Sequence, residues 1–524
     1  MIDCLLIGHN EISIGGYEKQ LAGFGQSSEM YRELNLNFVR INNQAHTFQD
    51  IFNRIYAGPD VPPFSMTETF SNALAYLGSY LVKHGFTFDY VNSFNHERDV
   101  LIRKLKTGNY RTVGITTTLY VSPEPLIEVV QLVRSVNDRI PIVVGGPFVY
   151  HQSCSLSEKA CECLFRDFIQ ADIYIRSNQG EATLVSLLSV MKAGSGLHTV
   201  PNIYYRANGA LRYSFDQRED NSLGDNLVDW SLFGGNGYRH LHVRTSVSCP
   251  FHCSFCACPD HQGKYQKVNP DLFQKELRGI MAFAGLESVY FIDDTLNFPA
   301  TKFKDFLKLL IREQIGFKWH SYFRCQFADE EMVALMKQAG CQGVYLGIES
   351  GNNTILSNMN KHATVEQYRK GIDLLKKYGI LSHGSFIIGF PGETEETVEE
   401  TRRFITESGI DFYRAQLWFY DPLTPVARLS EKFGLKGSNF RWSHHTMDSK
   451  TACDHLERLF TVIREPLSIP TYNFDFHSML HLHYKGIEWE KLKGTLAAFN
   501  DAIRRKLADP SAPDPAIDDF TSKG

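Results

Sequence analysis

The stretch "SVSCPFHCSFCACP" (residues 246–259) holds four of the 11 cysteines of the chain within ten positions. Cys249, Cys253 and Cys256 follow the spacing C-x₃-C-x₂-C, and Cys258 lies two positions beyond them. Structural zinc sites usually use two pairs of closely spaced ligands, and no matching second group stands near this stretch. Three thiolates on a four-iron cluster leave one iron without a protein ligand, and that iron can bind a substrate or a cofactor. The spacing therefore favours an iron–sulfur cluster with an open iron.

The bulk composition indicates a folded protein with several domains. Its 524 residues are 43% hydrophobic and 22% charged, with a formal net charge of −5, so charge gives no reason to expect nucleic acid as a ligand. No run of 18 apolar residues, the length of a transmembrane helix, occurs. The start, "MIDCLLIGHNE" (1–11), contains an acid and lacks a basic segment, which is typical of a strand and not of a signal peptide. We expect a cytoplasmic protein without membrane contact, whose reduced thiols disfavour a disulfide framework.

The first part of the chain alternates β-branched runs with amphipathic segments, which predicts a doubly wound parallel sheet. Strands are expected at 3–10, 87–94, 112–121 and 141–149, helices at 97–108 and 123–137, and a strand, a turn and a helix within 171–194. Ligands of such sheets bind beyond the carboxyl ends of the strands. The candidates at these ends are Thr116, Thr117, Thr118, Tyr120, Gly145, Gly146, Pro147, Gln179, Gly180 and Glu181. The insert from Glu11 to about Met66 has no clear pattern.

A second α/β rhythm predicts a partial (β/α)6 TIM barrel. Its strands are expected at 240–248, 288–297, 318–325, 343–350, 382–393 and 412–421. The cysteine stretch follows the first of these strands, where barrels of this kind place their chemistry. We expect a first domain at 1–215, a linker at 216–238, the barrel at 239–428 and a mostly helical domain that caps the substrate at 429–524, with a frayed end from 508.

With the aromatic Phe255 directly before Cys256, the cysteine spacing resembles that of the radical S-adenosylmethionine (SAM) superfamily. The resemblance implies a [4Fe–4S] cluster on Cys249, Cys253 and Cys256, whose open iron chelates the amino and carboxylate groups of SAM. Cys258 does not match the motif. It is either a thiol packed under the loop or a residue near the substrate or cluster.

Later strands resemble other SAM-binding parts of the superfamily. The stretch "FIIGFPGET" (386–394), with Ser385 before it and Gly389 within it, resembles the Gly-rich fifth strand beside the adenine. Glu349 in "GIES" (347–350) resembles the ribose ligand, because two hydroxyls suit one acceptor-only side chain. The alternative for Glu349 is a solvated or capping role.

Two further positions are expected to bind SAM. Asp293 and Asp294 in "FIDD" (291–294) stand where the superfamily commonly has a Gly-Gly-Glu segment that meets the amino group, and either aspartate fits. They are also candidates for acid–base work. Arg324 suits the planar SAM carboxylate, and an ordinary surface ion pair is its alternative.

A doubly wound domain before such a barrel resembles the cobalamin-binding subclass of the superfamily. The motif Asp-x-His-x-x-Gly is missing, which implies cobalt bound without a protein histidine. The glycines let the backbone approach a corrin closely, and the threonine hydroxyls at 116–118 can reach its amides and tail. Plain β-propensity is the alternative for the threonines.

The stretches "DCLLIGHNE" (3–11), "GITTTLYVSPEPLIEVV" (114–130) and "IVVGGPFV" (142–149) look most like the P-methyltransferase subfamily of phosphinothricin-type pathways. Trp418, Tyr420 and Asp421, at the end of the sixth strand, are candidate substrate contacts, with Tyr420 and Asp421 as catalytic candidates and packed core aromatics as the alternative. Of the other histidines, His477 and His481 are expected to pack or to lie at the surface, and a metal pair is the alternative.

The resemblance implies a methyltransferase in natural-product biosynthesis. It would move a methyl group from SAM through methylcobalamin to an unactivated carbon or a phosphinate phosphorus of a small molecule. One alternative is a cobalamin-dependent radical rearrangement or oxidation, and another is a non-catalytic sensor that binds the cluster and cobalamin. The implied partners are the small-molecule substrate and an electron donor such as flavodoxin or ferredoxin, and the protein is expected to be a monomer.

Overall fold

The computed structural model describes residues 1–10, 13–58, 63–65, 69–118, 120–234 and 238–521, so Glu11 and Met66, the expected limits of the insert, lie outside the described residues. Contacts divide the chain into two compact units. Unit 1 comprises Met1–Ile12, Thr69–Ser248 and Asp260–Leu286, and unit 2 comprises Ser13–Glu68, Cys249–Pro259 and Glu287–Gly524. This division differs from the predicted boundaries, because the insert groups with the barrel and residues 260–286 group with the first domain.

Unit 1 contains a mostly parallel sheet with strand order β10-β9-β8-β7-β6-β1-β5. Its strands are β1 (Ile2–His9), β5 (Phe88–Ser93), β6 (Tyr110–Thr116), β7 (Ile142–Gly145) and β8 (Ile173–Ile175), with antiparallel β9 (Ile203–Ala207) and β10 (Ala210–Tyr213) at one edge. Because β1 lies between β5 and β6, the winding direction reverses between β1 and β6. This is the flavodoxin-like order, whose ligands bind at that switch point.

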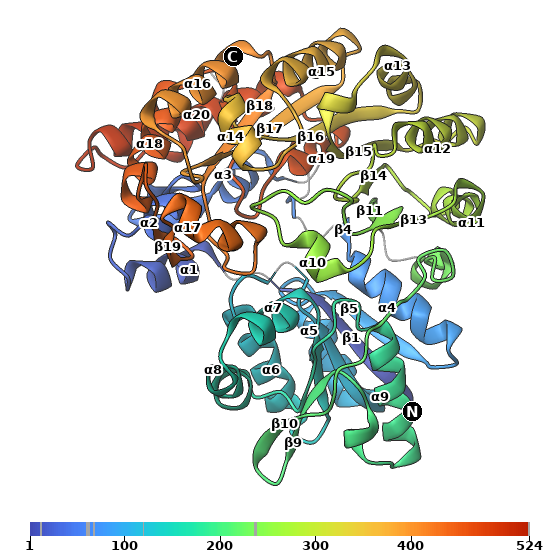
Figure 1. Ribbon diagram of the computed structural model, residues 1–524. Coiled ribbons are helices and arrows are strands. Elements are labelled where there is room, and N and C mark those ends of the chain that lie inside the picture. Colours follow the sequence, from blue (N-terminus) through green and yellow to red (C-terminus); the bar gives the residue numbers. More distant parts are fainter. Residues whose placement is uncertain (11–12, 59–62, 66–68, 119, 235–237, 522–524) are drawn as a thin grey trace. The chain divides into compact units, whose positions relative to one another are not determined.

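Helices cover both faces of this sheet (Figure 1). They are α4 (Asn72–Lys83) and α9 (Glu181–Ala193) on one face, and α5 (Arg98–Thr107) and α6 (Glu124–Val136) on the other. Alternate strand residues such as Leu5, Ile7 and Val113 are fully buried against α5 and α6. The strand expected within 141–149 runs into a Gly-Gly-Pro turn as predicted, since β7 ends at Gly145 and the helix α7 (Pro147–Ser155) begins at Pro147.

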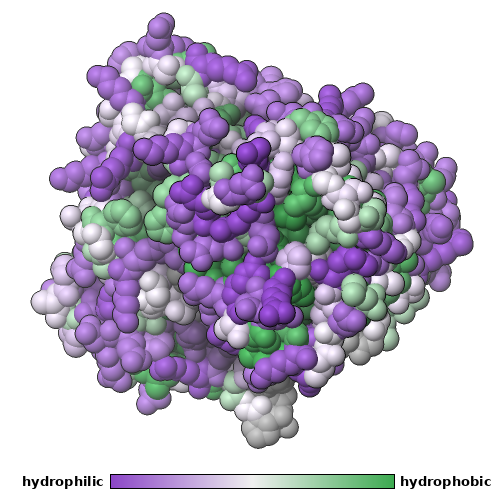
Figure 2. Space-filling model, turned by 90° about the horizontal axis from the view of Figure 1, so that it is seen from below, coloured by the Kyte–Doolittle hydropathy of each residue, from purple (hydrophilic) through white to green (hydrophobic). Residues whose placement is uncertain are grey.

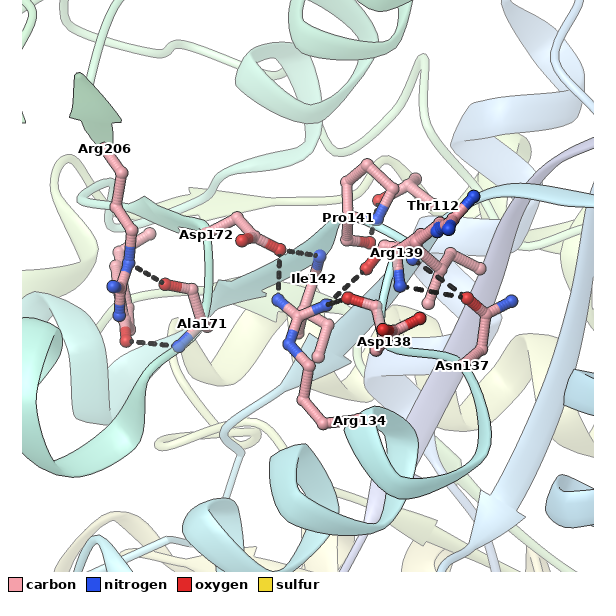
Figure 3. A network of polar contacts seen from close by, with 12 residues as sticks. Thr112, Arg134, Asn137, Asp138, Arg139, Pro141, Ile142, Ala171, Asp172 and Arg206 are labelled. Carbon is pink, nitrogen blue, oxygen red and sulfur yellow. Dashed lines mark hydrogen bonds and ion pairs between the residues drawn. The ribbon is translucent and has the colours of Figure 1, made fainter. Parts of the chain in front are cut away.

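A polar network fastens the ends of β7 and β8 that lie away from the switch point (Figure 3). The carboxylate of Asp172 accepts hydrogen bonds from Arg134 Nη2 at 2.5 Å and from the backbone N of Ile142 at 2.7 Å. Arg134 Nη1 also donates to the carbonyl of Ile140 at 2.7 Å. One arginine thus joins α6 to the chain entering β7, which fixes the strands whose other ends carry candidate site residues.

The described part of the predicted linker (216–238) is folded against unit 1 and is not a solvent-exposed connection. Glu219 is buried and accepts hydrogen bonds from Thr183 Oγ1 and Ala182 N. Trp230 and Phe233, which follow it, are 2% and 0% exposed in unit 1. These apolar and buried polar contacts explain why a Gly-rich, polar stretch is nevertheless folded onto the domain.

Unit 1 also holds several short elements outside the main sheet. They are β4 (Thr69–Phe70), which pairs in parallel with β11 (His240–Val243), the hairpin β12 (Ser246–Val247) and β13 (Gln266–Lys267), and the helices α8 (Glu158–Cys163) and α11 (Pro270–Met281). The helix α11 begins with Asn269 capping its first turn and with Pro270 in that turn.

Unit 2 contains parallel strands in the order β21-β18-β17-β16-β15-β14. They are β14 (Ser288–Phe291), β15 (Lys318–Phe323), β16 (Cys341–Glu349), β17 (Leu381–Ile388), β18 (Phe412–Leu417) and β21 (Leu467–Ser468). Connecting them are α12 (Ala300–Arg312), α13 (Glu330–Gln338), α15 (Val365–Lys377) and α16 (Glu395–Glu407), which run along the outside of the strands (Figure 1). The short helix α14 (Asn353–Asn358) precedes α15 in the connection from β16 to β17. This strand–helix alternation is the predicted barrel architecture.

The rest of unit 2 consists of the insert and the C-terminal elements. The insert forms α1 (Ile14–Ala22), α2 (Glu29–Asn35), β2 (Phe38–Ile41), β3 (Gln44–Thr47) and α3 (Phe48–Tyr56). The C-terminal part forms α17 (Ser430–Phe433), β19 (Lys436–Ser438), β20 (Arg441–Ser443), α18 (Ser449–Val462), α19 (Phe476–Tyr484) and α20 (Trp489–Ala508). The end is packed and not frayed as far as it is described, since Phe520 is fully buried.

A buried ion pair joins the insert to the strand β18. Arg414 on β18 is 2% exposed, and its Nη2 lies 3.1 Å from Glu33 Oε1 of α2. The other carboxylate oxygen of Glu33 accepts from Leu417 N at 3.1 Å. Apolar contacts add to this, with the rings of Phe48 and Phe474 4.4 Å apart. The insert is therefore a built part of the barrel unit.

None of the helices in the described ranges combines the length and the apolar character needed to cross a bilayer. In Figure 2, hydrophilic residues predominate on the face that is shown, and hydrophobic residues lie between them in separate patches.

Candidate active site

The cysteine loop leaves β12 and is held in place by its own backbone. Ser254 N donates to Met359 O at 2.8 Å, and Ser254 O accepts from Val426 N at 2.9 Å. The side chain of Asn360 donates to His252 O at 2.7 Å. All 11 cysteines are free. The loop that carries Cys249, Cys253 and Cys256 is thus anchored on unit 2, at the side where the barrel strands end.

Two of the predicted ligands, Cys249 and Cys256, have hydrogen-bonding neighbours at their sulfur atoms. Cys249 Sγ lies 3.3 Å from Thr295 Oγ1, and Cys258 N donates to Cys256 Sγ at 3.4 Å. Hydrogen bonds from Cys258 lower the pKa of Cys256, whereas burial raises the pKa of Cys249. Backbone hydrogen bonds to sulfur are a normal feature of iron–sulfur sites. In the part of the chain that the structure describes, no group of three His, Cys, Asp or Glu side chains is arranged to hold a single metal ion. A [4Fe–4S] cluster does not need such an arrangement, because each thiolate binds a different iron.

Cys258 contacts a second candidate residue. Its Sγ donates to Asp294 Oδ2 at 3.2 Å. Asp293, next to it, is 1% exposed, whereas Asp294 is exposed. Of the two alternatives for Cys258, the contact with Asp294 supports a place near the cluster and the expected SAM amino group. Asp294 thus contacts the cysteine loop.

Arg324 is buried behind the cysteine loop. It is 9% exposed, and its guanidinium lies 3.7 Å from the centre of the Phe251 ring. Its backbone N donates to Asn297 Oδ1 at 3.0 Å, and its Nη2 donates to the carbonyl of Lys361. This burial does not fit the alternative of a surface ion pair. A buried cation stacked on the loop is compatible with the predicted contact to a SAM carboxylate.

Glu349 lies at the end of β16 with a neighbour that the sequence pattern did not reveal. It has a left-handed backbone, with φ of 69°. The register with β17 shifts between Gly347 and Glu349. Lys361 Nζ lies 2.8 Å from Glu349 Oε1, with the two side chains 7% and 10% exposed. A solvated role for Glu349 does not fit this buried ion pair.

The turn after β17 is shaped by Gly389 and Glu393. Gly389 has φ of 95°, and a Cβ there would lie 2.4 Å from the Trp442 ring. Its N donates to the carboxyl of Glu393, which is fully buried, and burial raises the pKa of Glu393 to about 8. Ser385, earlier on β17, is partly buried and pairs in register with Arg414. A tight, apolar turn at this place suits an adenine, as predicted for Ser385 and Gly389.

The candidate catalytic residues lie in an aromatic cluster after β18. The rings of Trp418 and Tyr420 are stacked 5.2 Å apart, and Trp418 lies 5.0 Å from Trp442. Tyr420 is 6% exposed and pairs through its backbone with Asn439. Asp421 Oδ1 accepts from Leu423 N at 2.9 Å, which closes a turn. These contacts match the packed-aromatic alternative, and catalysis by Tyr420 and Asp421 stays a prediction.

In unit 1, the ends of β1 and β6 meet at the switch point. Asn10 Nδ2, directly after β1, donates to Pro125 O at 2.8 Å. Thr117 Oγ1 donates to Gly145 O at 2.9 Å. Gly146 has φ of 107°, and a Cβ there would lie 2.9 Å from Thr117 Oγ1. The strand ends are therefore packed backbone to backbone, and only glycine fits at position 146.

The other predicted residues of this unit lie around the same strand ends. Thr116 Oγ1 and Thr118 Oγ1 are 3.0 Å apart, and Tyr120 is 7% exposed. Gly145 ends β7, and Pro147 lies in the first turn of α7. The structure thus gathers this part of the prediction at one edge of the sheet.

The Gln-Gly-Glu turn (179–181) after β8 contacts the segment that was predicted to be a linker (216–238). Gln179 Oε1 accepts from Asn221 N at 2.8 Å, and Glu181 Oε2 accepts from Asn221 Nδ2 at 3.1 Å. Glu181 Oε1 also lies 3.7 Å from Arg244 Nη2. Gly180 has φ of 88° and precedes α9. These contacts occupy the Gln179 and Glu181 side chains within unit 1, and their role in binding a cofactor stays a prediction.

Sequence reasoning missed Lys361, Glu393 and Thr295. Lys361 and Glu393 follow the carboxyl ends of β16 and β17, and Thr295 follows β14. The only sequence signal for these positions was the general rule that barrel chemistry lies in the loops after the strands. Their side chains carry no motif. Only the three-dimensional neighbours, Glu349, Gly389 and Cys249, identify them.

Comparisons with known proteins agree with this geometry. Residues 243–405 match the model of the Radical SAM superfamily. An "uncharacterized methyltransferase" of Pyrococcus horikoshii is 29% identical over 326 residues, which is 61% of this chain and 68% of that protein. The anaerobic magnesium-protoporphyrin IX monomethyl ester cyclase of Rubrivivax gelatinosus is 26% identical over 385 residues, 69% of this chain and 66% of that protein. Residues 243–405 of the barrel region are thus similar to radical SAM domains, which use a [4Fe–4S] cluster and SAM.

A solved structure has the same fold along almost the whole chain. The radical SAM methyltransferase TsrM from Kitasatospora setae, with cobalamin and a [4Fe-4S] cluster bound, aligns with a TM-score of 0.63 and 17% identity, over 98% of this chain and 100% of that one. At this identity the likeness shows the fold, and it confirms the predicted architecture of sheet domain, partial barrel and helical C-terminus. The predicted cluster, SAM and cobalamin agree with these relatives.

Proposed function

We propose that this chain, which carries a radical SAM domain over residues 243–405, is a cobalamin-dependent radical SAM methyltransferase that acts on a small molecule. The observation that carries the proposal is the cysteine loop. Three cysteines in the radical SAM spacing lie on a loop fixed to the barrel unit, with a backbone N–H donating to Cys256 Sγ. The second support is the flavodoxin-like order of the unit 1 sheet, which places a ligand site at the ends of β1 and β6.

The residues present fit the proposed groups. The donor set of Cys249, Cys253 and Cys256 suits three irons of a [4Fe–4S] cluster. Gly146 fits a cradle in which the backbone approaches a large flat ligand, since its φ of 107° excludes a side chain. When bound, the cluster, SAM and cobalamin together supply radical formation and methyl transfer. Asn10 and Thr117 would line the cobalamin site.

The chain's own residues have defined tasks in this proposal. The cysteine loop holds the cluster, and Arg324 places a buried positive charge beside it. Asp294 faces the loop as an acceptor for the SAM amino group, and Glu349 as an acceptor for ribose hydroxyls. Packed aromatic rings after β18, among them Trp418, exclude water from the loops that follow the strands, which protects a radical reaction from stray hydrogen donors.

We further propose that the methylated group is a phosphinate phosphorus. The support is the resemblance of the stretches at 3–11, 114–130 and 142–149 to the P-methyltransferase subfamily. An unactivated carbon is the competing acceptor. Incubation with a phosphinate-bearing amino acid, followed by phosphorus NMR, separates the two. A new phosphorus resonance that couples to a methyl group from labelled SAM supports the phosphinate.

The activity is tested with full-length protein that is reconstituted anaerobically with iron, sulfide and cobalamin. With SAM, a reductant and the phosphinate, S-adenosylhomocysteine and 5′-deoxyadenosine should both form. The Cys253→Ala variant, which lacks a cluster ligand, should form no 5′-deoxyadenosine. Consumption of SAM without S-adenosylhomocysteine would refute the methyltransferase.

A second candidate is a radical oxidation or rearrangement without methyl transfer. The match to a cyclase from Rubrivivax gelatinosus over 69% of this chain favours it. It predicts 5′-deoxyadenosine as the sole nucleoside product.

A further inference from the structure

Lys361 is a buried cation beside the cysteine loop. It follows α14 and is 6% exposed. Its backbone N donates to Leu356 O at 3.0 Å, and its carbonyl accepts from Arg324, so both backbone groups are fixed. Lysine is almost never buried to this extent unless its charge is paired. Its partner is Glu349, whose Oε1 lies 2.8 Å from Lys361 Nζ.

The backbone of β16 is shaped to accommodate this pair. Glu349 has the rare left-handed conformation, with φ of 69°, and the strand register shifts just before it. A Cβ on Gly347 would lie 2.6 Å from Glu349 Oε1 and 3.1 Å from Lys361 Nζ. Left-handed non-glycine residues cost free energy and gather at functional sites. The strand end therefore holds the carboxylate in one place at a local cost.

The ammonium group lies between this carboxylate and the cysteine loop. Its Nζ is 5.4 Å from the centre of the Phe255 ring, and Phe255 stands directly before Cys256. Since Lys361 engages Oε1, the other oxygen of Glu349 can accept from a ligand hydroxyl. The pair thus connects the cluster loop with the expected ribose position.

We propose that Lys361 is a positioning residue of the SAM site, which holds the Glu349 carboxylate aimed at the ribose hydroxyls. The proposal rests on the SAM binding of the proposed function. Removing one partner of a buried ion pair leaves the other charge uncompensated and without the contact that fixes its position. Loss of the Lys361 charge would therefore weaken the acceptor that the ribose needs, without removing any cluster ligand.

The test measures SAM binding to full-length protein with a reconstituted cluster, without cobalamin, reductant or substrate. Lys361→Met should raise the SAM dissociation constant about 10- to 100-fold, the range for a charged hydrogen bond. Lys361→Arg should recover most of the affinity. The matched control is Lys377→Met, whose side chain is 60% exposed and whose loss should leave the affinity unchanged. Iron content and visible absorbance confirm that each variant holds the cluster.

The double variant decides how Lys361 acts. If it works through Glu349, Lys361→Met should add less than twofold to the effect of Glu349→Gln. Equal effects in both backgrounds, or a Lys361→Met variant with unchanged affinity, overturn the proposal. Gly347→Ala keeps both charges but displaces the Glu349 carboxylate, and it should weaken SAM binding as well; unchanged affinity there also contradicts the proposal. If wild-type protein with its cluster binds no SAM, the proposed function itself fails.

Discussion

Replacement of Glu393 by glutamine should remove a strong pH dependence from the stability of the barrel unit. Glu393 is fully buried in the turn after β17, and burial raises its pKa from 4.5 to about 8. The folded state therefore holds the proton more tightly than the unfolded chain. The stabilisation is complete below the unfolded pKa of 4.5 and is lost as the pH rises through the folded value of about 8.

The magnitude follows from the size of the shift. Between pH 5 and pH 8 this carboxyl should lower the free energy of unfolding by about 3–4 kcal/mol. Glutamine imitates the protonated form, since its carbonyl can still accept from Gly389 N. The Glu393→Gln variant should therefore match the wild type near pH 5 and exceed its stability near pH 8.

Urea unfolding followed by tryptophan fluorescence measures this difference, because Trp442 lies against Gly389. The control is Glu407→Gln, whose carboxylate is 59% exposed and whose effect should stay within about 0.5 kcal/mol at every pH. The reasoning is refuted if wild type and Glu393→Gln lose stability in parallel between pH 5 and pH 8.

Three further outcomes are expected. Cys253→Ala should lose the visible absorbance of the cluster, whereas Cys258→Ser should keep it, and iron and sulfide analysis of both variants checks this difference. Gly146→Ala should weaken cobalamin binding at least tenfold in equilibrium dialysis, because its Cβ would lie 2.9 Å from a threonine oxygen; unchanged binding would contradict the placement at the strand ends. Arg414→Met should cost about 3–5 kcal/mol by leaving Glu33 unpaired in the interior, and the double change with Glu33→Met should recover most of that loss in urea unfolding.

The sequence predicted the two sheets because periodicity and turn residues are local signals. The strands at 2–9 and 381–388 follow from apolar runs that end in turn residues. The insert escaped prediction. Its Glu33 is paired with Arg414, 381 positions later, and no local pattern reports such a contact.

The candidate site likewise contains residues that the sequence predicted and residues that it did not. The cysteine loop was predicted from its spacing, and Glu349 and Gly389 from the resemblance of their stretches to the radical SAM superfamily. Lys361 was not, because a lysine in a loop is usually solvated and only its burial against Glu349 distinguishes it. Cys258 lay beside the motif without a role, and its contact with Asp294 at 3.2 Å gives it a neighbour in the expected SAM site.

The central claim, methyl transfer through cobalamin, is tested most directly without any substrate. Full-length protein with its cluster and reduced cobalamin is incubated anaerobically with SAM that carries a ¹³C-labelled methyl group. The account predicts labelled methylcobalamin and an equal amount of S-adenosylhomocysteine. Unlabelled cobalamin together with an absence of S-adenosylhomocysteine would contradict it.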